Sequence, residues 1–408
     1  MDVLYPCCCG LDVHKTTVVA CVRDARGTAV RQTTRTFGTT TAALLDLADW
    51  LRAIGVTHAA MESTGVYWKP VYAVLEGLCA IVLVNAQHLK AVPGRKTDVI
   101  DAAWIAELLQ HGLLRGSFVP PREQRDLREL TRYRTTLVDE RARLANRLQK
   151  VLEDAQLKLG DVATDVLGAS GRAMLQAIAD GETDAVRLAA LAQGRLRRKE
   201  AALVAALTGR VRPVHRFLLR EQLAHVTAIE TAIDHVSAEI ARCLAPFQTE
   251  IDLLDTIPGI GRRTAETILA EIGTDLARFR TAPRLAAWAG VCPGQDRSAG
   301  RQRNARARRG NPWLRRALLE AALGATASKR TYFHAQFRRI AARRGRERAA
   351  VAVAHSLVVV VFHVLTDREP YHDLGIQHFD QRDAARMQRQ LVRRLEHLGY
   401  KVSLQPAA

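Results

Sequence analysis

The first third of the chain alternates between short β-rich segments and amphipathic helical segments. Three short apolar runs within residues 6–37, separated by turn-prone stretches, predict an antiparallel meander of three strands. Leucine and isoleucine spacing then predicts a helix from Thr41 to Ile54. The elements predicted after it are a strand at 58–63, a helix at 69–78, a strand at 80–86 and a helix at 98–110. This order predicts an α/β domain with a mixed sheet, which ends before the Pro-Pro break at 120 and 121.

The middle of the chain carries two long stripes of apolar residues with heptad spacing. The first runs from Leu127 to Val151 and the second from Ile229 to Phe247, with steps that alternate between three and four residues. This spacing predicts two long helices that pair as an antiparallel hairpin or form a dimer interface. A solvated helix with one buried side would give the same stripe. Residues 160–200 between the stripes predict Ala-rich helices.

Residues 251–366 predict an all-helical region with glycine-marked turns at Pro258–Gly261 and Gly290–Gly294. The most apolar run, Ala349 to Leu365, contains two histidines and reaches only the lower length limit of a membrane span, so we expect a buried helix and no membrane partner. The sequence thus predicts four segments: an α/β domain at 1–120, a helical coiled-coil connector at 121–249, a helical domain at 250–366 and a tail at 367–408.

Charge indicates the partner. The chain has 408 residues, 48% of them hydrophobic, and a formal net charge of +18. Between Arg297 and Arg348 sixteen Lys or Arg stand against two acids, so +14 of this charge lies in one segment. Clustered cations bind nucleic acid by releasing its condensed counterions. We therefore expect a nucleic-acid partner rather than a merely soluble basic protein.

The seven cysteines show no spacing typical of a zinc site and are expected to be reduced, mostly buried thiols. The N-terminal residues lack the pattern of a secretory signal. Together these features predict a protein of the bacterial cytoplasm that associates with the nucleoid when active.

Four acidic residues are candidates for a metal site. Asp12 and Glu62 fall at the ends of the first and fourth predicted strands, where catalytic groups of α/β domains gather. Asp98 and Asp101 are three residues apart on a predicted helix, so they share one face and repel each other unless a cation lies between them. Singly, each is more readily explained as an ordinary turn residue, surface charge or helix-cap residue than as a metal ligand.

Together the four carboxylates suit Mg²⁺, and two such ions can assist the attacking and leaving oxygens of a phosphodiester. The order of three-stranded meander, helix, strand, helix and strand resembles that of ribonuclease H-like nucleases, including RuvC-type junction resolvases. We therefore expect a ribonuclease H-like (RuvC-like) fold for the α/β domain.

Longer stretches carry a closer resemblance. The segments GLDVHK, MESTGVYWKP and VNAQHLKAVPGRKTDVIDA, and later DTIPGIGRRTAETILAEIG and GNPWLRRALLEAA, resemble the Asp-Glu-Asp-Asp insertion-sequence transposases of the IS110 family, which are bridge-RNA-guided recombinases. The match covers roughly residues 7–120 and 250–365. The resemblance implies that Asp12, Glu62, Asp98 and Asp101 are catalytic residues that bind Mg²⁺, as two ions.

The turn in TIPGIGRRTA resembles a helix-hairpin-helix element that grips a nucleic-acid backbone. Gly259 and Gly261 permit a tight turn, the following helix start offers amides to a phosphate, and Arg262 and Arg263 add charge. A plain glycine-rich turn between two helices is the alternative.

An arginine-rich loop precedes a helix predicted to start near Pro312. Its serine, Ser298, is by itself more readily explained as an ordinary polar loop residue than as a nucleophile. The resemblance implies otherwise, because family members carry a nucleophilic serine in an SxG element, and Ser298 followed by Gly300 matches it. The arginines expected to bind nucleic acid there are Arg297, Arg301, Arg303, Arg306, Arg308 and Arg309.

The expected protein is therefore a transposase that cuts and rejoins donor and target DNA. By resemblance its acids and serine come from different protomers, as a homodimer that pairs into a tetramer, with a bridge RNA as guide. The alternatives are a RuvC-like nuclease in which water attacks, an actin-like or sugar-kinase ATPase, and a non-catalytic nucleic-acid-binding protein carried by the arginine loop alone.

Overall fold

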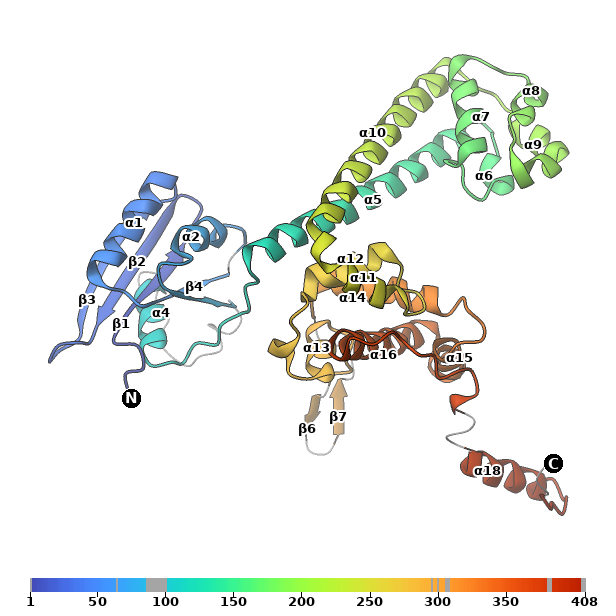
Figure 1. The fold of residues 1–408 in the computed structure, drawn as a ribbon. Coiled ribbons are helices and arrows are strands. Elements are labelled where there is room, and N and C mark those ends of the chain that lie inside the picture. The colour runs from blue at the N-terminus through green and yellow to red at the C-terminus, as the bar shows by residue number, and fades with distance from the viewer. Residues whose placement is uncertain are drawn as a thin grey trace. The chain divides into compact units, whose positions relative to one another are not determined.

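The structure is a computed structural model that describes residues 2–63, 65–85, 101–294, 296–298, 301–304, 309–379 and 384–404. The chain divides into two compact units, Met1–Pro121 and Arg122–Ala408 (Figure 1). The first unit is built on a five-stranded sheet. The second is mainly helical.

The sheet of the first unit has the strand order β3-β2-β1-β4-β5. Strands β1, β2 and β3 form an antiparallel meander, while β4 and β5 run parallel to β1. The prediction of a mixed sheet entered by a meander is confirmed. The strands are β1 (Cys7–Val13), β2 (Thr17–Asp24), β3 (Arg31–Gly38), β4 (His58–Glu62) and β5 (Ala80–Val84), and the helices are α1 (Thr41–Ile54), α2 (Trp68–Leu75) and α4 (Asp101–Gln110).

The two faces of this sheet are covered by different helices. Alternate strand residues point to opposite faces. Leu11 and Met61 are buried in one cluster with residues of α1 and α2, whereas Cys8 and Ala60 are buried with Ile105 and other residues of α4. The helix α4 therefore covers the face that carries the even-numbered residues of β1 and β4.

Helix α4 lies very close to β1 and runs antiparallel to it. The thiol of Cys8, near the start of β1, donates to the carbonyl of Ala106 at 3.5 Å, and an ideal Cβ built on Gly10 would lie 2.1 Å from the carbonyl oxygen of Ala102. Only glycine permits this approach. The first residue of α4, Asp101, consequently lies toward the carboxyl ends of β1 and β4.

The second unit begins with two long helices that pack along each other, α5 (Arg122–Asp154) and α10 (Pro213–Leu244). Figure 1 shows them as an antiparallel hairpin. Leu144 and Leu148 of the first predicted stripe and Ile229 and Ile233 of the second are buried in one cluster, whereas Phe247 lies beyond α10 and is exposed. Intramolecular pairing thus accounts for most of both stripes.

Short helices close the far end of this hairpin and share its core. They agree with the Ala-rich helices expected between the stripes. They are α6 (Leu159–Val162), α7 (Ala169–Asp180), α8 (Ala185–Ala190), the 3₁₀ helix η1 (Gly194–Lys199) and α9 (Glu200–Leu207).

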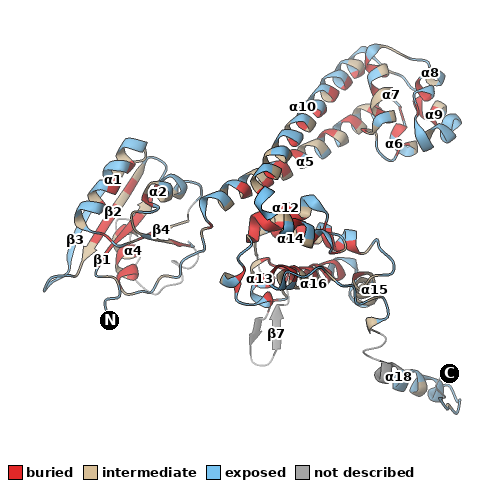
Figure 2. Cartoon of the chain, in the orientation of Figure 1, coloured by how far each residue is buried: buried red, intermediate tan, exposed pale blue. Residues whose placement is uncertain are grey.

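A helical bundle follows the hairpin, and its core takes in Leu127 from the start of α5. Figure 2 shows the buried residues along the hairpin and within the bundle. The bundle contains η2 (Ala245–Phe247), α11 (Gln248–Asp255), α12 (Arg262–Ile272), η3 (Ala277–Phe279), α13 (Ala282–Trp288), α14 (Pro312–Ala325), α15 (Tyr332–Arg344) and α16 (Arg346–Asp367), and α18 (Ala384–His397) follows in the tail.

Helix α16 is, among the described residues, the one helix long and apolar enough to cross a membrane. It packs against α11, α13, α14 and α15, and Val353, Leu357 and Val361 are fully buried in the bundle core. These contacts explain its apolar sequence and agree with the prediction of a buried helix.

The prediction that residues 251–366 are all-helical is wrong at one place. Between α13 and α14 the backbone forms a two-stranded antiparallel hairpin of β6 (Asp296–Ser298) and β7 (Arg301–Asn304). Its sequence is rich in Arg and Gln and lacks the β-branched alternation that marks strands. Four of the seven cysteines are buried, in agreement with the expectation of mostly buried side chains.

The contact between Gly10 and α4 gives a stability prediction. Changing Gly10 to Ala places a methyl group against the backbone of α4 and should lower the free energy of unfolding by about 3 kcal/mol, the upper range for overpacking. Chemical denaturation monitored by circular dichroism measures this. Gly27→Ala is the matched control and should change stability little, because an ideal Cβ on Gly27 would lie no closer than 4.0 Å to any neighbouring atom. Equal stability of the two variants would contradict the close approach of α4.

Candidate functional site

Three of the four predicted acids gather at one edge of the sheet. Leu11 of β1 is level with Met61 of β4 in a parallel register, so the next residues, Asp12 and Glu62, are neighbours at the strand ends. Asp12 and Glu62 each lie two residues after a strand position that faces α4. Because side chains of a strand alternate between the two faces, both acids lie on the face that α4 covers. Asp101 begins α4 at the same edge. The fourth acid, Asp98, lies outside the described residues.

The carboxylate of Asp12 has a near partner that the sequence reasoning missed. Its Oδ2 lies 3.0 Å from Nε2 of His14, in the turn between β1 and β2, and the Asp12 side chain is 24% exposed. A carboxylate and an imidazole two residues apart in a tight turn could have been recognised as neighbours from the GLDVHK segment. A protonated His14 would compete with a metal ion for Asp12.

The donor set has the chemistry of a divalent-cation site. Glu62 and Asp101 are partly exposed, as Asp12 is, so all three can reach a ligand from solvent. Within the described residues, however, no three His, Cys, Asp or Glu side chains stand close enough together to hold a metal ion. The acids are therefore aligned at one edge without a closed set of ligands among the described residues.

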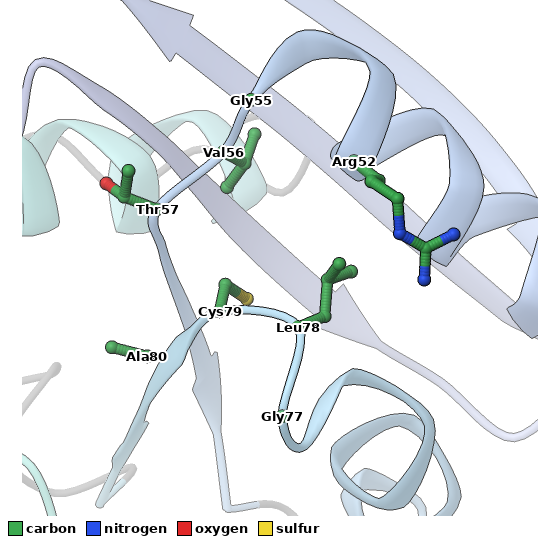
Figure 3. A pocket seen from close by; sticks show the side chains of 8 residues that line it. All are labelled: Arg52, Gly55, Val56, Thr57, Gly77, Leu78, Cys79 and Ala80. Atoms are coloured by element: carbon green, nitrogen blue, oxygen red, sulfur yellow. The ribbon is translucent and has the colours of Figure 1, made fainter.

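A separate pocket of about 590 Å³ opens at the other edge of the sheet (Figure 3). It lies where α1 ends and where β4 and β5 begin, and Arg52, Thr57 and Cys79 contribute to its wall. Its lining contains no acidic residue. The pocket is thus distinct from the acid edge.

The predicted helix-hairpin-helix turn joins α11 to α12. Gly259 has a φ of +86°, and an ideal Cβ on it would lie 2.2 Å from the carbonyl oxygen of Ala321 in α14. This packing supports the alternative of a turn between helices for Gly259. Gly261 caps α12 with open space around it, and Arg263 is exposed. A phosphate contact at this turn stays a prediction.

Arg262, also expected to bind phosphate, is exposed and pairs with a buried acid of its own helix. Its Nε donates to Oε1 of Glu266 at 3.1 Å. The other carboxylate oxygen of Glu266 accepts from Arg134 of α5 at 2.6 Å, and both partners of that pair are buried.

Ser298 is the last residue of β6 and pairs with Arg301 of β7. Arg297 and Arg303 belong to the same hairpin, and Arg309, which follows it, is exposed. The predicted contacts of Arg306 and Arg308 lie outside the described residues. The backbone therefore presents the serine where the first strand of an arginine-rich hairpin ends.

The segment that carries this hairpin is closed at its base. An ideal Cβ on Gly310 would lie 2.3 Å from the backbone nitrogen of Gly290, and the backbone nitrogen of Asn311 donates to the carbonyl of Trp288 at 2.9 Å. Asn311 also caps α14, where its side chain accepts from the amides of Trp313 and Leu314, both at 3.0 Å. The helix start predicted near Pro312 is confirmed.

A second buried acid of α12, Glu271, was not anticipated. It is fully buried and pairs with Arg132 at 2.7 Å and Arg128 at 3.4 Å. Burial lowers the pKa of Arg128 to about 10, and the charge of Glu271 offsets part of that effect. The sequence signal was weak: Glu266 and Glu271 stand among the buried apolar residues of one short helix.

Comparison with known proteins agrees with this organisation. Residues 9–156 match the family model of IS110-type DEDD transposases, described as "Transposase", and residues 251–338 match "Transposase IS116/IS110/IS902 family". The chain is 28% identical to the "Transposase for insertion sequence element IS1111A" of Coxiella burnetii, over 71% of this chain and 72% of the relative. It is 27% identical to the "Probable family 20 transposase" of Pseudomonas aeruginosa, over 67% and 72%.

A shorter match is to a relative of another name. The "Pilin gene-inverting protein" of Moraxella bovis is 33% identical over 78 residues, which is 19% of this chain and 24% of the relative.

An acid-edged α/β unit followed by a basic helical unit, with these matches, defines the class: the protein is a transposase, an enzyme that cuts and rejoins DNA. Within that class the chain belongs to the IS110 family of insertion-sequence transposases. Its DNA substrate follows from this class, and the match to the DEDD transposases is consistent with the use of divalent metal.

Proposed function

We propose that this transposase cleaves DNA with a divided active site, in which Asp12, Glu62, Asp98 and Asp101 hold Mg²⁺, as two ions, and Ser298 attacks the DNA. The observation that carries the proposal is the parallel register of β1 and β4, which sets Asp12 beside Glu62 at the edge where α4 begins with Asp101. The strand order β3-β2-β1-β4-β5 supports a ribonuclease H-like assignment for this unit.

The acids and the arginines have complementary tasks. Carboxylate oxygens are the ligands that Mg²⁺ prefers, and the bound ions would neutralise charge on the phosphate and favour the ionised form of the attacking hydroxyl. The arginines in and after the hairpin would hold the DNA phosphates through charge-assisted hydrogen bonds; they are Arg297, Arg301, Arg303, Arg306, Arg308 and Arg309.

The serine step transfers a phosphoryl group without net hydrolysis. The Oγ of Ser298 forms a new bond to phosphorus and loses its proton, while one deoxyribose oxygen leaves and gains a proton. The product is a phosphoserine that links the protein to one DNA end. A hydroxyl of another DNA end then displaces the serine, which rejoins donor and target strands.

The serine and the acids lie on different units, and we propose that they meet in an assembly of protomers. One protomer supplies the acids and another supplies Ser298 in each site, within a homodimer that pairs into a tetramer. The long α5–α10 hairpin exposes Tyr133 and Phe217, apolar surface that a second protomer can cover. Such an assembly works in the bacterial cytoplasm, at the nucleoid.

Guidance by a bridge RNA is the remaining part of the proposal. The resemblance to bridge-RNA-guided recombinases motivates it, and the net charge of +18 gives the protein the electrostatic means to hold RNA as well as DNA.

The serine mechanism makes a direct prediction. Wild-type protein and labelled element-junction DNA in Mg²⁺ should form a covalent adduct on denaturing gels, and Ser298→Ala should form none. The water-attack alternative uses the same acids without the serine. Undiminished strand cleavage by Ser298→Ala would therefore establish a RuvC-like nuclease instead.

The acids are tested in the same reaction. Asp12→Asn removes one charge at constant size and should reduce cleavage on the order of 100-fold or more while leaving DNA binding intact. Asp49→Asn, at an acid of the same unit that is 71% exposed and paired with Arg52, is the matched control. Full activity of Asp12→Asn would leave only a non-catalytic binding role for the acid edge.

The divided site predicts complementation between two inactive variants. Co-expressed Ser298→Ala and Asp12→Asn chains should regain about a quarter of the wild-type adduct. About half of randomly mixed dimers are heterodimers, and in each heterodimer one of the two sites combines intact acids with an intact serine. Gel quantification of the co-purified mixture measures this. If acids and serine came from the same protomer, the mixture would stay inactive.

RNA guidance predicts that active protein carries RNA. Transposase expressed together with its element should co-purify with an RNA, and ribonuclease treatment should abolish recombination until that RNA is returned. Recombination that is indifferent to ribonuclease would exclude a guide and leave recognition of DNA to the protein.

A further inference from the structure

The carboxylate of Glu271 lies where three separate parts of the second unit meet. Glu271 is in the last turn of α12 and is 0% exposed. A carboxylate is buried in a protein only where cations and hydrogen-bond donors replace its water. The residues that do so here come from α5 and from the base of the segment that carries Ser298.

Two arginines of α5 grip Glu271 from one side. Arg132 donates from Nε to Oε1 at 2.7 Å and from Nη2 to Oε2 at 2.9 Å, a bidentate pair. Nε of Arg128 lies 3.4 Å from Oε2 and donates to the backbone carbonyl of Ala270 at 3.1 Å. Position 132 is 139 residues from Glu271 in the chain, so this is a long-range tie.

The same arginines also touch both flanks of the hairpin segment. The guanidinium of Arg128 lies 5.9 Å from the ring centre of Trp288, the last residue of α13, and that of Arg132 lies 5.7 Å from the ring centre of Trp313 in α14. Cations over aromatic rings add attraction where both are partly desolvated. The start of α5 thus contacts the helices before and after the hairpin.

Asn311 completes the site from the other side. Its Nδ2 donates to Oε2 of Glu271 at 2.6 Å, while its Oδ1 accepts from the backbone amides of Trp313 and Leu314. The amide nitrogen therefore donates while the amide oxygen accepts, and these contacts fix the orientation of the side chain. Asn311 is a helix cap and a ligand of the buried carboxylate at once.

The chain between Gly290 and Gly310 includes Ser298 and leaves the bundle through this base. Gly310 packs on the backbone of Gly290, whose carbonyl also accepts from Arg315. The contact between Gly290 and Gly310, next to Asn311, therefore holds the two ends of the hairpin segment together.

We infer that Glu271 is a positioning residue, which through Asn311 fixes the base of the Ser298 hairpin segment to α5. The inference rests on the proposed function, because the contact matters for the reaction only if Ser298 is the nucleophile. The consequence is that attack by the serine depends on the α5–α12 contact, far from the serine in sequence. α5 begins at Arg122, directly after the acid-bearing unit, so the helix that leaves that unit is the one tied to the serine segment.

The chemistry of the site argues against a role in stability alone. A buried carboxylate with arginines is often no more stabilising than well-packed apolar residues, because desolvation offsets the attraction. Buried polar groups do fix orientation, however, and a misplacement of a reacting group by about 1 Å can cost roughly 100-fold in rate. Positioning is therefore the property that this set of residues supplies.

Asn311→Asp is the decisive variant. Aspartate caps a helix as well as asparagine does, but it sets a second carboxylate against Glu271. We expect adduct formation at saturating DNA to slow by roughly 10-fold to 100-fold. The added carboxylate should also lower the melting temperature, so the rate is expressed per folded molecule, and the DNA concentration for half-maximal rate should stay close to wild type. A merely structural defect would lower only the amount of active protein, not the rate per folded molecule.

Asp184→Asn is the matched control. It exchanges the cap of α8, within the short helices at the end of the α5–α10 hairpin, and should react at the wild-type rate.

Asn311→Ser keeps the cap with a side chain too short to reach Glu271, and it serves if Asn311→Asp fails to fold. Wild-type rates in folded Asn311→Asp or Asn311→Ser would overturn the inference. A wild-type protein that cleaves DNA without forming an adduct would instead overturn the serine mechanism, and this inference with it. The wild-type lane therefore separates the two failures.

Discussion

The missing side chain at Gly10 is the constraint on which the acid edge depends. It lets the backbone of α4 lie directly on β1, with Ala102 and Ala106 where a Cβ would stand. Because α4 runs antiparallel to β1, that contact brings its first residue, Asp101, to the strand ends that carry Asp12 and Glu62. Any larger residue at position 10 would move the helix and with it one of the acids.

The second unit solves a similar problem with charge instead of close backbone contact. α12 carries two buried glutamates, and α5 answers each with arginine: Arg134 for Glu266, and Arg132 with Arg128 for Glu271. Burying an unpaired carboxylate costs much free energy, so each glutamate is stable only in the packing arrangement that places it beside its arginine. These pairs hold the bundle to the start of the long hairpin in one geometry.

Local elements followed closely from the sequence where periodicity was strong. The helix Thr41–Ile54 and the start of α14 at Pro312 lie where their spacing and caps predict, because helix limits depend on nearby residues. The hairpin around Ser298 was not predicted, because no local pattern in the sequence marks its strands. Its short, arginine-rich strands have no apolar alternation that would mark them as strands.

The order of residue types along the chain supplies the chemistry: acids at strand ends, a serine among arginines and a strongly basic helical region. The packing of the elements establishes which of these residues meet. The register of β1 with β4 pairs Asp12 with Glu62, and the contact of α5 with α12 and α14 makes Glu271, Arg132 and Asn311 one site. Such partners are distant in sequence, and their contacts depend on how whole elements pack rather than on any local spacing.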